Sequence, residues 1–148
     1  MTERKTLQLT VDVPADPETV FEAMTDWGRQ NEWMLGTRVR TEALQGRGVG
    51  GGIAAFTGIG PIGFWDTMTI TAWDEPRLVE VDHTGDLVRG IGIFRVERAG
   101  GGSRFVWREE VDLPLGRLGE LGWLAVKPLL AAGVALSLRR FARFAVRG

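Results

Sequence analysis

The chain has 148 residues, a formal net charge of −1 and 44% hydrophobic residues. This composition excludes a disordered chain, and the length predicts a single domain, 1–148, around one hydrophobic core. The near-zero net charge gives no reason to expect nucleic acid as a partner. There is no cysteine and only one histidine, which excludes a thiol nucleophile, a thiolate metal site and metal motifs with two histidines. We therefore expect neither a metal nor another cofactor.

The N-terminal segment predicts a cytoplasmic location. Residues 1–13, MTERKTLQLTVDV, contain no apolar run long enough for a signal peptide. The absence of cysteine fits a reducing compartment.

The first elements are predicted from apolar spacing and helix-start residues. Residues 6–13 alternate apolar and polar side chains, which predicts a half-buried strand. Asp16 and Pro17 are typical of an N-cap and a first helical residue, so a helix is expected to begin there. A second short helix is expected near 27–34. Further along, alternation interrupted by Gly, Pro and Asp predicts six antiparallel strands, near 37–44, 52–57, 64–73, 78–84, 88–97 and 103–112.

The last part of the chain predicts one long helix. Residues 115–147 are mostly helix formers and small apolar residues, with Pro128 as the only breaker. The stretch 121–138 is apolar enough to suggest a membrane span, but Lys127 and Pro128 lie in its middle. A span would also leave the face of the sheet uncovered. We therefore predict an α+β fold in which a curved antiparallel sheet of about seven strands wraps a helix buried on nearly all sides.

Four arginines make the end of this helix basic: Arg139, Arg140, Arg143 and Arg147. Cations suit the C-terminal end of a helix, which is the simpler interpretation. Contact with a membrane surface is the functional alternative.

Three ionisable residues, Asp66, His83 and Glu109, fall on strand faces that are otherwise apolar. Burying such groups costs free energy unless each has a partner or lies in a wet cavity. A turn at 74–77 would place Asp66 opposite His83 or one diagonal step away, which predicts a pair. The next turns would pair Val79 with Gly92 and Gly92 with Glu109. Glu109 would then lie about 15 Å from His83 and form a separate polar feature.

The order of elements resembles the helix-grip fold of the START-like superfamily, which includes birch pollen allergen and the polyketide cyclase/dehydrase and lipid-transport group. The resemblance covers nearly the whole chain, which is similar to small bacterial members of that group. It rests on the segments VPADPETVFEAMTDW, TMTITAWDEPRLVEVDHTG, GIGIFRVE, SRFVWREEVDLP and SLRRFARF.

This resemblance implies binding of a hydrophobic or lipid-like small molecule in an internal cavity. The alternative that it implies is a cyclase or dehydratase in which Asp66 and His83 act as acid–base groups. We expect the cavity between the concave sheet face and 117–140, where Gly90 and Gly92 withdraw side-chain volume. The expected ligand-binding residues are Asp66, Met68, His83, Gly92, Phe94, Trp107, Glu109, Leu129 and Gly133.

Pro128 predicts a joint in the long helix, because proline cannot donate to the helical hydrogen-bond ladder and crowds the preceding turn. We predict that the helix kinks there or begins its long straight part there, and that 115–127 moves as a gate over the cavity. Hydrogen exchange followed by mass spectrometry should then be faster in 115–127 than in 130–140. Equal protection of the two segments would contradict the gate.

Overall fold

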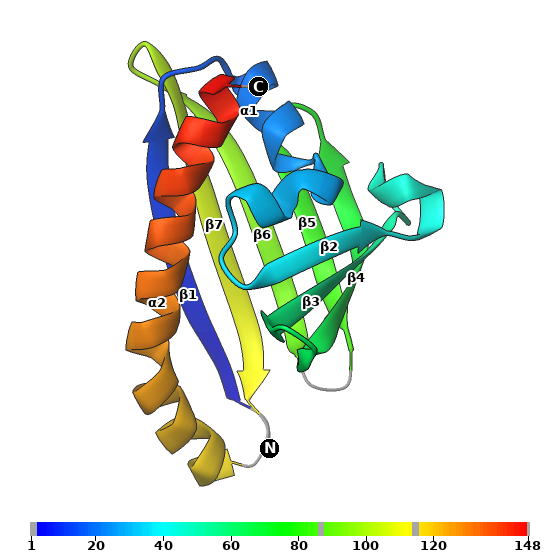
Figure 1. Ribbon diagram of the computed structural model, residues 1–148, viewed down its shortest axis with the longest axis vertical. Coiled ribbons are helices and arrows are strands. Elements are labelled where there is room, and N and C mark those ends of the chain that lie inside the picture. The colour runs from blue at the N-terminus through cyan, green and yellow to red at the C-terminus, as the bar shows by residue number, and fades with distance from the viewer. Residues whose placement is uncertain (1–2, 86–87, 114–115, 148) are drawn as a thin grey trace.

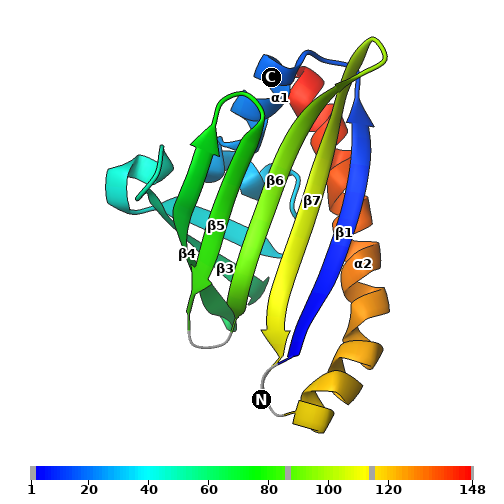
Figure 2. The ribbon, with the colours of Figure 1, turned by 180° about the vertical axis from the view of Figure 1, so that it is seen from behind.

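The computed structural model describes residues 3–85, 88–113 and 116–147. The elements follow in the order β1 (Glu3–Val13), α1 (Pro17–Met24), η1 (Trp27–Glu32), β2 (Thr37–Thr41), η2 (Ala43–Gly46), β3 (Gly52–Ile59), β4 (Ile62–Asp74), β5 (Leu78–Thr84), β6 (Arg89–Ala99), β7 (Gly102–Leu113) and α2 (Gly116–Arg147). The strands form one 7-stranded sheet in the order β1-β7-β6-β5-β4-β3-β2. It curls into an antiparallel half-barrel beside α2 (Figures 1 and 2), which confirms the predicted helix-grip fold.

The short helices form where the local sequence predicts them. Asp16 caps α1 by accepting a hydrogen bond from the Thr19 backbone N–H at 2.8 Å, and Pro17 occupies the first turn. The second predicted helical stretch is the 3-10 helix η1, whereas η2 was not predicted. The first residue predicted for the long helix, Leu115, lies outside the described residues.

A β-bulge in β4 changes which side chains face the core. Pairing with β5 passes from Ile70 opposite Val81 to Trp73 opposite Val79, with a register shift between Ile70 and Ala72. Strict alternation along β4 would put Ala72 on the inner face of Ile70, but the extra residue of the bulge inverts the alternation beyond it. Trp73 points inward instead and packs edge-on against Phe21 of α1.

Aromatic side chains close one end of the half-barrel. Phe141 of α2 lies between Trp33, which follows η1, and Phe105 of β7, with ring centroids 4.8 and 4.7 Å away. All three side chains are buried. The packing joins the C-terminal half of α2 to the sheet at the end where α1 and η1 also lie (Figure 1).

The other half of α2 departs from the prediction of a helix buried on nearly all sides. Burial begins at Val134, whereas most side chains between residues 117 and 132 are exposed. By length and composition α2 is long and apolar enough to cross a membrane. Only 17% of its most apolar 18-residue segment is buried. The prediction is wrong for this half because the open sheet supports α2 along one edge rather than wrapping it (Figure 1).

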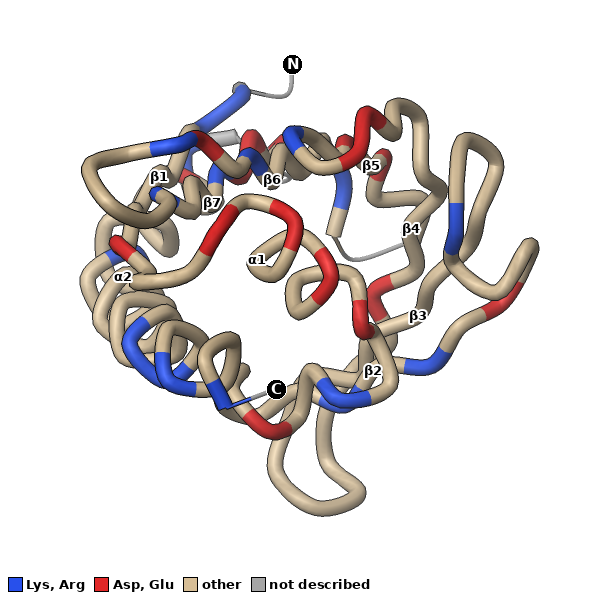
Figure 3. Tube along the Cα trace, turned by 90° about the horizontal axis from the view of Figure 1, so that it is seen from above, with Lys and Arg blue, Asp and Glu red and all other residues tan. Residues whose placement is uncertain are grey.

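Before its last turns, α2 exposes several large apolar side chains: Leu118, Leu121, Leu124, Val126, Leu129, Leu130 and Leu136. The arginines of the last turns follow them (Figure 3), with Arg139, Arg143 and Arg147 exposed and Arg140 donating to the Glu32 carbonyl. Their contact with a membrane surface stays a prediction. The helix continues through Pro128, and the proposed gate also stays a prediction.

Phe141→Ala should lower the free energy of unfolding by about 3–5 kcal/mol, because it empties space between two buried rings. Leu118→Ala on the same helix should change it by less than about 0.5 kcal/mol, since Leu118 is 71% exposed. Urea denaturation of both variants measures the difference. Comparable losses would contradict the division of α2 into a packed half and an exposed half.

Candidate functional site

A cavity of about 600 Å³ lies between the concave face of the sheet and residues 123–137 of α2. Every strand contributes to its wall, together with α1, η1 and α2, and most of the lining side chains are apolar. The cavity opens to solvent beside α2, where the lining residue Leu129 is 76% exposed. Its volume falls within the usual range of small-molecule pockets, about 300–1,000 Å³.

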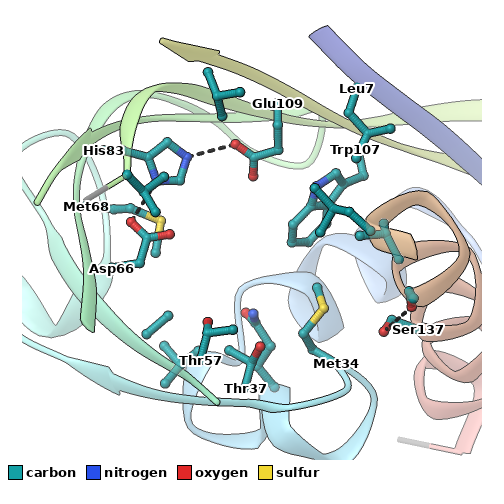
Figure 4. Close-up of a pocket in the computed structure, with 18 of the residues that line it drawn as sticks. Leu7, Met34, Thr37, Thr57, Asp66, Met68, His83, Trp107, Glu109 and Ser137 are labelled. Carbon is teal, nitrogen blue, oxygen red and sulfur yellow. Dashed lines mark hydrogen bonds and ion pairs between the residues drawn. The ribbon is translucent and has the colours of Figure 1, made fainter. Parts of the chain in front are cut away.

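This wall contains a histidine held between two carboxylates (Figure 4). His83 of β5 has its Nδ1 atom 2.8 Å from Asp66 Oδ1 of β4 and its Nε2 atom 2.7 Å from Glu109 Oε2 of β7. The His83 side chain is 3% exposed, and the two carboxylates are each 16% exposed. We call Asp66, His83 and Glu109 the carboxylate–imidazole cluster.

The predicted pairing of Asp66 with His83 is confirmed. Met68 lies directly opposite His83, so Asp66 is one diagonal step away on the same face. That separation lets the two side chains meet in a hydrogen bond.

The prediction that Glu109 forms a separate feature about 15 Å from His83 is wrong. Gly92 pairs with Val81 rather than with Val79, so the register of β5 against β6 differs by two residues from the expected one. Glu109, which is opposite Gly92 as expected, is thereby brought close to His83. A Cβ atom at Gly92 would lie 3.3 Å from Glu109 Oε2, so the glycine leaves room for the carboxylate to reach across β6.

The two carboxylates determine the charge of the ring. Burial lowers the pKa of His83, but the hydrogen bonds and negative charges of Asp66 and Glu109 outweigh it and raise the pKa to about 10. The ring is therefore an imidazolium at neutral pH and donates one N–H to each carboxylate. Burial raises the pKa of Glu109, while its hydrogen bond with His83 opposes the rise.

The chain matches a protein family over residues 4–145, and that family is described as “Polyketide cyclase / dehydrase and lipid transport”. The chain belongs to this family. No curated protein matches it.

Solved structures show the same fold at low sequence identity. TTHA0849 from Thermus thermophilus is 16% identical with a TM-score of 0.81, over 97% of this chain and 98% of that one. SA2116, a protein of unknown function from Staphylococcus aureus, is 12% identical with a TM-score of 0.76, over 99% and 96%. Ara h 8.0201 is 15% identical with a TM-score of 0.65, over 99% and 100%.

Most of the residues that we expected to bind ligand in this family member do line the cavity. They are Asp66, Met68, His83, Phe94, Trp107, Glu109, Leu129 and Gly133. Gly92 is not part of the wall, because Val81, Phe94 and Glu109 cover the position that its side chain would take. Contact of the lining residues with a ligand stays a prediction.

The sequence prediction missed the wall opposite the carboxylate–imidazole cluster. Met34, Thr37 and Thr57 line that side (Figure 4). The alternation of Ala55 and Thr57 along β3 was a signal for two inward positions. The loop position of Met34 had no such signal.

Ser137 is another polar lining residue that the sequence did not assign to the cavity. Its hydroxyl donates to the Gly133 carbonyl at 2.8 Å and accepts from the Leu35 backbone N–H at 3.1 Å. It therefore fastens the loop before β2 to α2.

His83 is the only histidine, so its NMR signals report the cluster directly. The ring should stay protonated through pH 8 and titrate near 10. Since the pKa is raised from 6.5, the contribution of His83 to stability should be complete below pH 6.5 and be lost as the pH rises toward 10.

Glu109→Gln should lower the pKa of His83, because it removes one of the two charges that hold the proton. Glu110→Gln is the matched control, since Glu110 pairs with Arg108 instead. A wild-type ring that titrates near 6.5, or equal effects of the two variants, would contradict the assigned cluster.

Proposed function

We propose that the protein binds a hydrophobic or lipid-like small molecule in this cavity, for sequestration or transfer. The observation that carries the proposal is a mostly apolar cavity of about 600 Å³ that is open to solvent and has one charged cluster in its wall. Ligand pockets usually combine such an apolar wall with a few polar groups that orient the bound molecule. Membership of a family that includes lipid transport supports this proposal.

The shape of the wall also supports occupation by a ligand. Gly133 of α2 lines the cavity, and a Cβ atom placed there would have no heavy atom within 4 Å. Larger side chains would fit this space, yet the sequence leaves it empty. Apolar cavities attract water poorly because water needs several polar partners, whereas an apolar ligand gains free energy by leaving water.

A second candidate function, an enzyme of cyclase or dehydratase type, is favoured by the carboxylate–imidazole cluster. Burial raises the pKa of Glu109, which is the direction that general-acid catalysis by a carboxyl group requires. Both ring nitrogens of His83 are engaged, so Asp66 or Glu109 would touch the substrate and His83 would be a positioning residue.

Mass spectrometry of small molecules that copurify with the native protein separates the two functions. Under the binding proposal the copurified molecule is recovered unchanged after incubation with the protein. Conversion into a product, abolished in Glu109→Gln, would favour the enzyme instead.

Filling the cavity should prevent binding. Gly133→Phe should weaken binding of Nile red at least about tenfold, or 1.4 kcal/mol, because the added ring occupies the space of the probe. Fluorescence titration of wild type and variant gives the two dissociation constants.

Gly122→Phe is the matched control for this experiment. Gly122 lies on the same helix, is exposed and also has open space at its Cβ position, but it does not line the cavity. Binding to this variant should equal that of wild type. Undiminished binding to Gly133→Phe would overturn the proposed site.

A further inference from the structure

The carboxylate–imidazole cluster has more hydrogen-bond acceptors than donors. His83 has two N–H groups as an imidazolium, and each is directed at a carboxylate oxygen, Asp66 Oδ1 or Glu109 Oε2. The ring therefore keeps no donor for a ligand. Although His83 lines the cavity, it acts on a ligand through its two carboxylates.

Each carboxylate keeps one oxygen that accepts no hydrogen bond from the described part of the chain. These atoms are Oδ2 of Asp66 and Oε1 of Glu109. Both side chains point into the cavity (Figure 4) and are partly exposed. A ligand that reaches the cluster thus meets acceptor oxygens.

The charge of the cluster also favours a ligand group that donates hydrogen bonds. One imidazolium between two carboxylates leaves a net negative charge in a mostly apolar wall. Apart from the His83 imidazolium, Arg89 is the one cation among the described lining residues, and it is exposed at the start of β6. The other lining acid, Asp112, already pairs with Arg4 at 2.9 Å. The indole N–H groups of Trp33 and Trp107, which also line the cavity, are buried and have no hydrogen-bond partner among the described residues.

We propose that the ligand is an apolar molecule with a hydrogen-bond-donating head, preferably a protonated amine, that faces Asp66 and Glu109. The inference rests on the proposed function and names the ligand class of the same cavity. An ammonium donates to both free oxygens and balances the negative charge, which a hydroxyl does only in part. A carboxylate brings a like charge and no donor, so its burial beside the cluster is opposed.

Three ligands with the same ten-carbon chain test the proposal: decylamine, decanol and decanoate. Each is titrated below its aggregation concentration at pH 7 against protein loaded with Nile red. Decylamine should bind at least about tenfold more tightly than decanol, and decanoate should be the weakest of the three. Decanoate binding as tightly as decylamine would overturn the amine preference while leaving the proposed function intact. Failure of Nile red and of all three ligands to bind would overturn both.

Two variants locate the preference at the cluster. Glu109→Gln should weaken decylamine at least about tenfold and leave decanol within about twofold, because only the charge-assisted contact is lost. Glu110→Gln removes the same charge from the adjacent residue, which does not line the cavity, and should leave decylamine binding unchanged. Equal losses in the two variants would overturn the assignment to the cluster.

A wild-type measurement keeps the test valid if Glu109→Gln does not fold. Decylamine should shift the NMR signals of the single histidine, because the ammonium binds to the carboxylates that hold its ring. Decanoate at the same concentration should leave them in place. Shifts of equal size with both ligands would overturn the inference.

Discussion

Trp33, Phe105 and Phe141 pack together at one end of the curved sheet, and the shape of the molecule depends on that packing. A single curved sheet has one concave face, which must be covered by other elements of the chain. Here the aromatic rings bind the C-terminal half of α2 to that face, whereas the first half runs along the edge of the sheet beside β1 and is mostly exposed (Figure 1). The closed end provides the stability of a packed core, and the open end provides volume for a ligand.

The carboxylate–imidazole cluster lies in the wall of this hollow part. Burying an ionic group is costly unless its hydrogen bonds are complete, and both nitrogens of His83 have a carboxylate partner. Three strands contribute to the cluster, so it also ties β4 and β5 to β7 across β6. The glycine at 92 permits this link because a side chain there would meet the Glu109 carboxylate. A positive ring enclosed by two negative groups leaves an acceptor surface in an apolar cavity.

The helix-grip fold could be predicted from the sequence because its signals are local. Alternating strands, the Asp16–Pro17 helix start and the long apolar helix each depend on neighbours within a few residues. The Asp66–His83 pair could also be predicted, because one short turn joins their strands. The pairing of β5 with β6 was expected two residues out of register, and this error separated Glu109 from the predicted Asp66–His83 pair.

The sequence by itself determined which side chains share a strand face, except beyond the bulge in β4, because the period of two residues holds only along an uninterrupted strand. It also determined that a histidine and two acids would lie among apolar neighbours. The tertiary structure alone decided that all three meet, because strand register is a property of two chain segments and the turn between them. It likewise decided that half of α2 is exposed. Composition identifies an apolar helix, but its burial depends on how far the sheet and the aromatic core extend beside it.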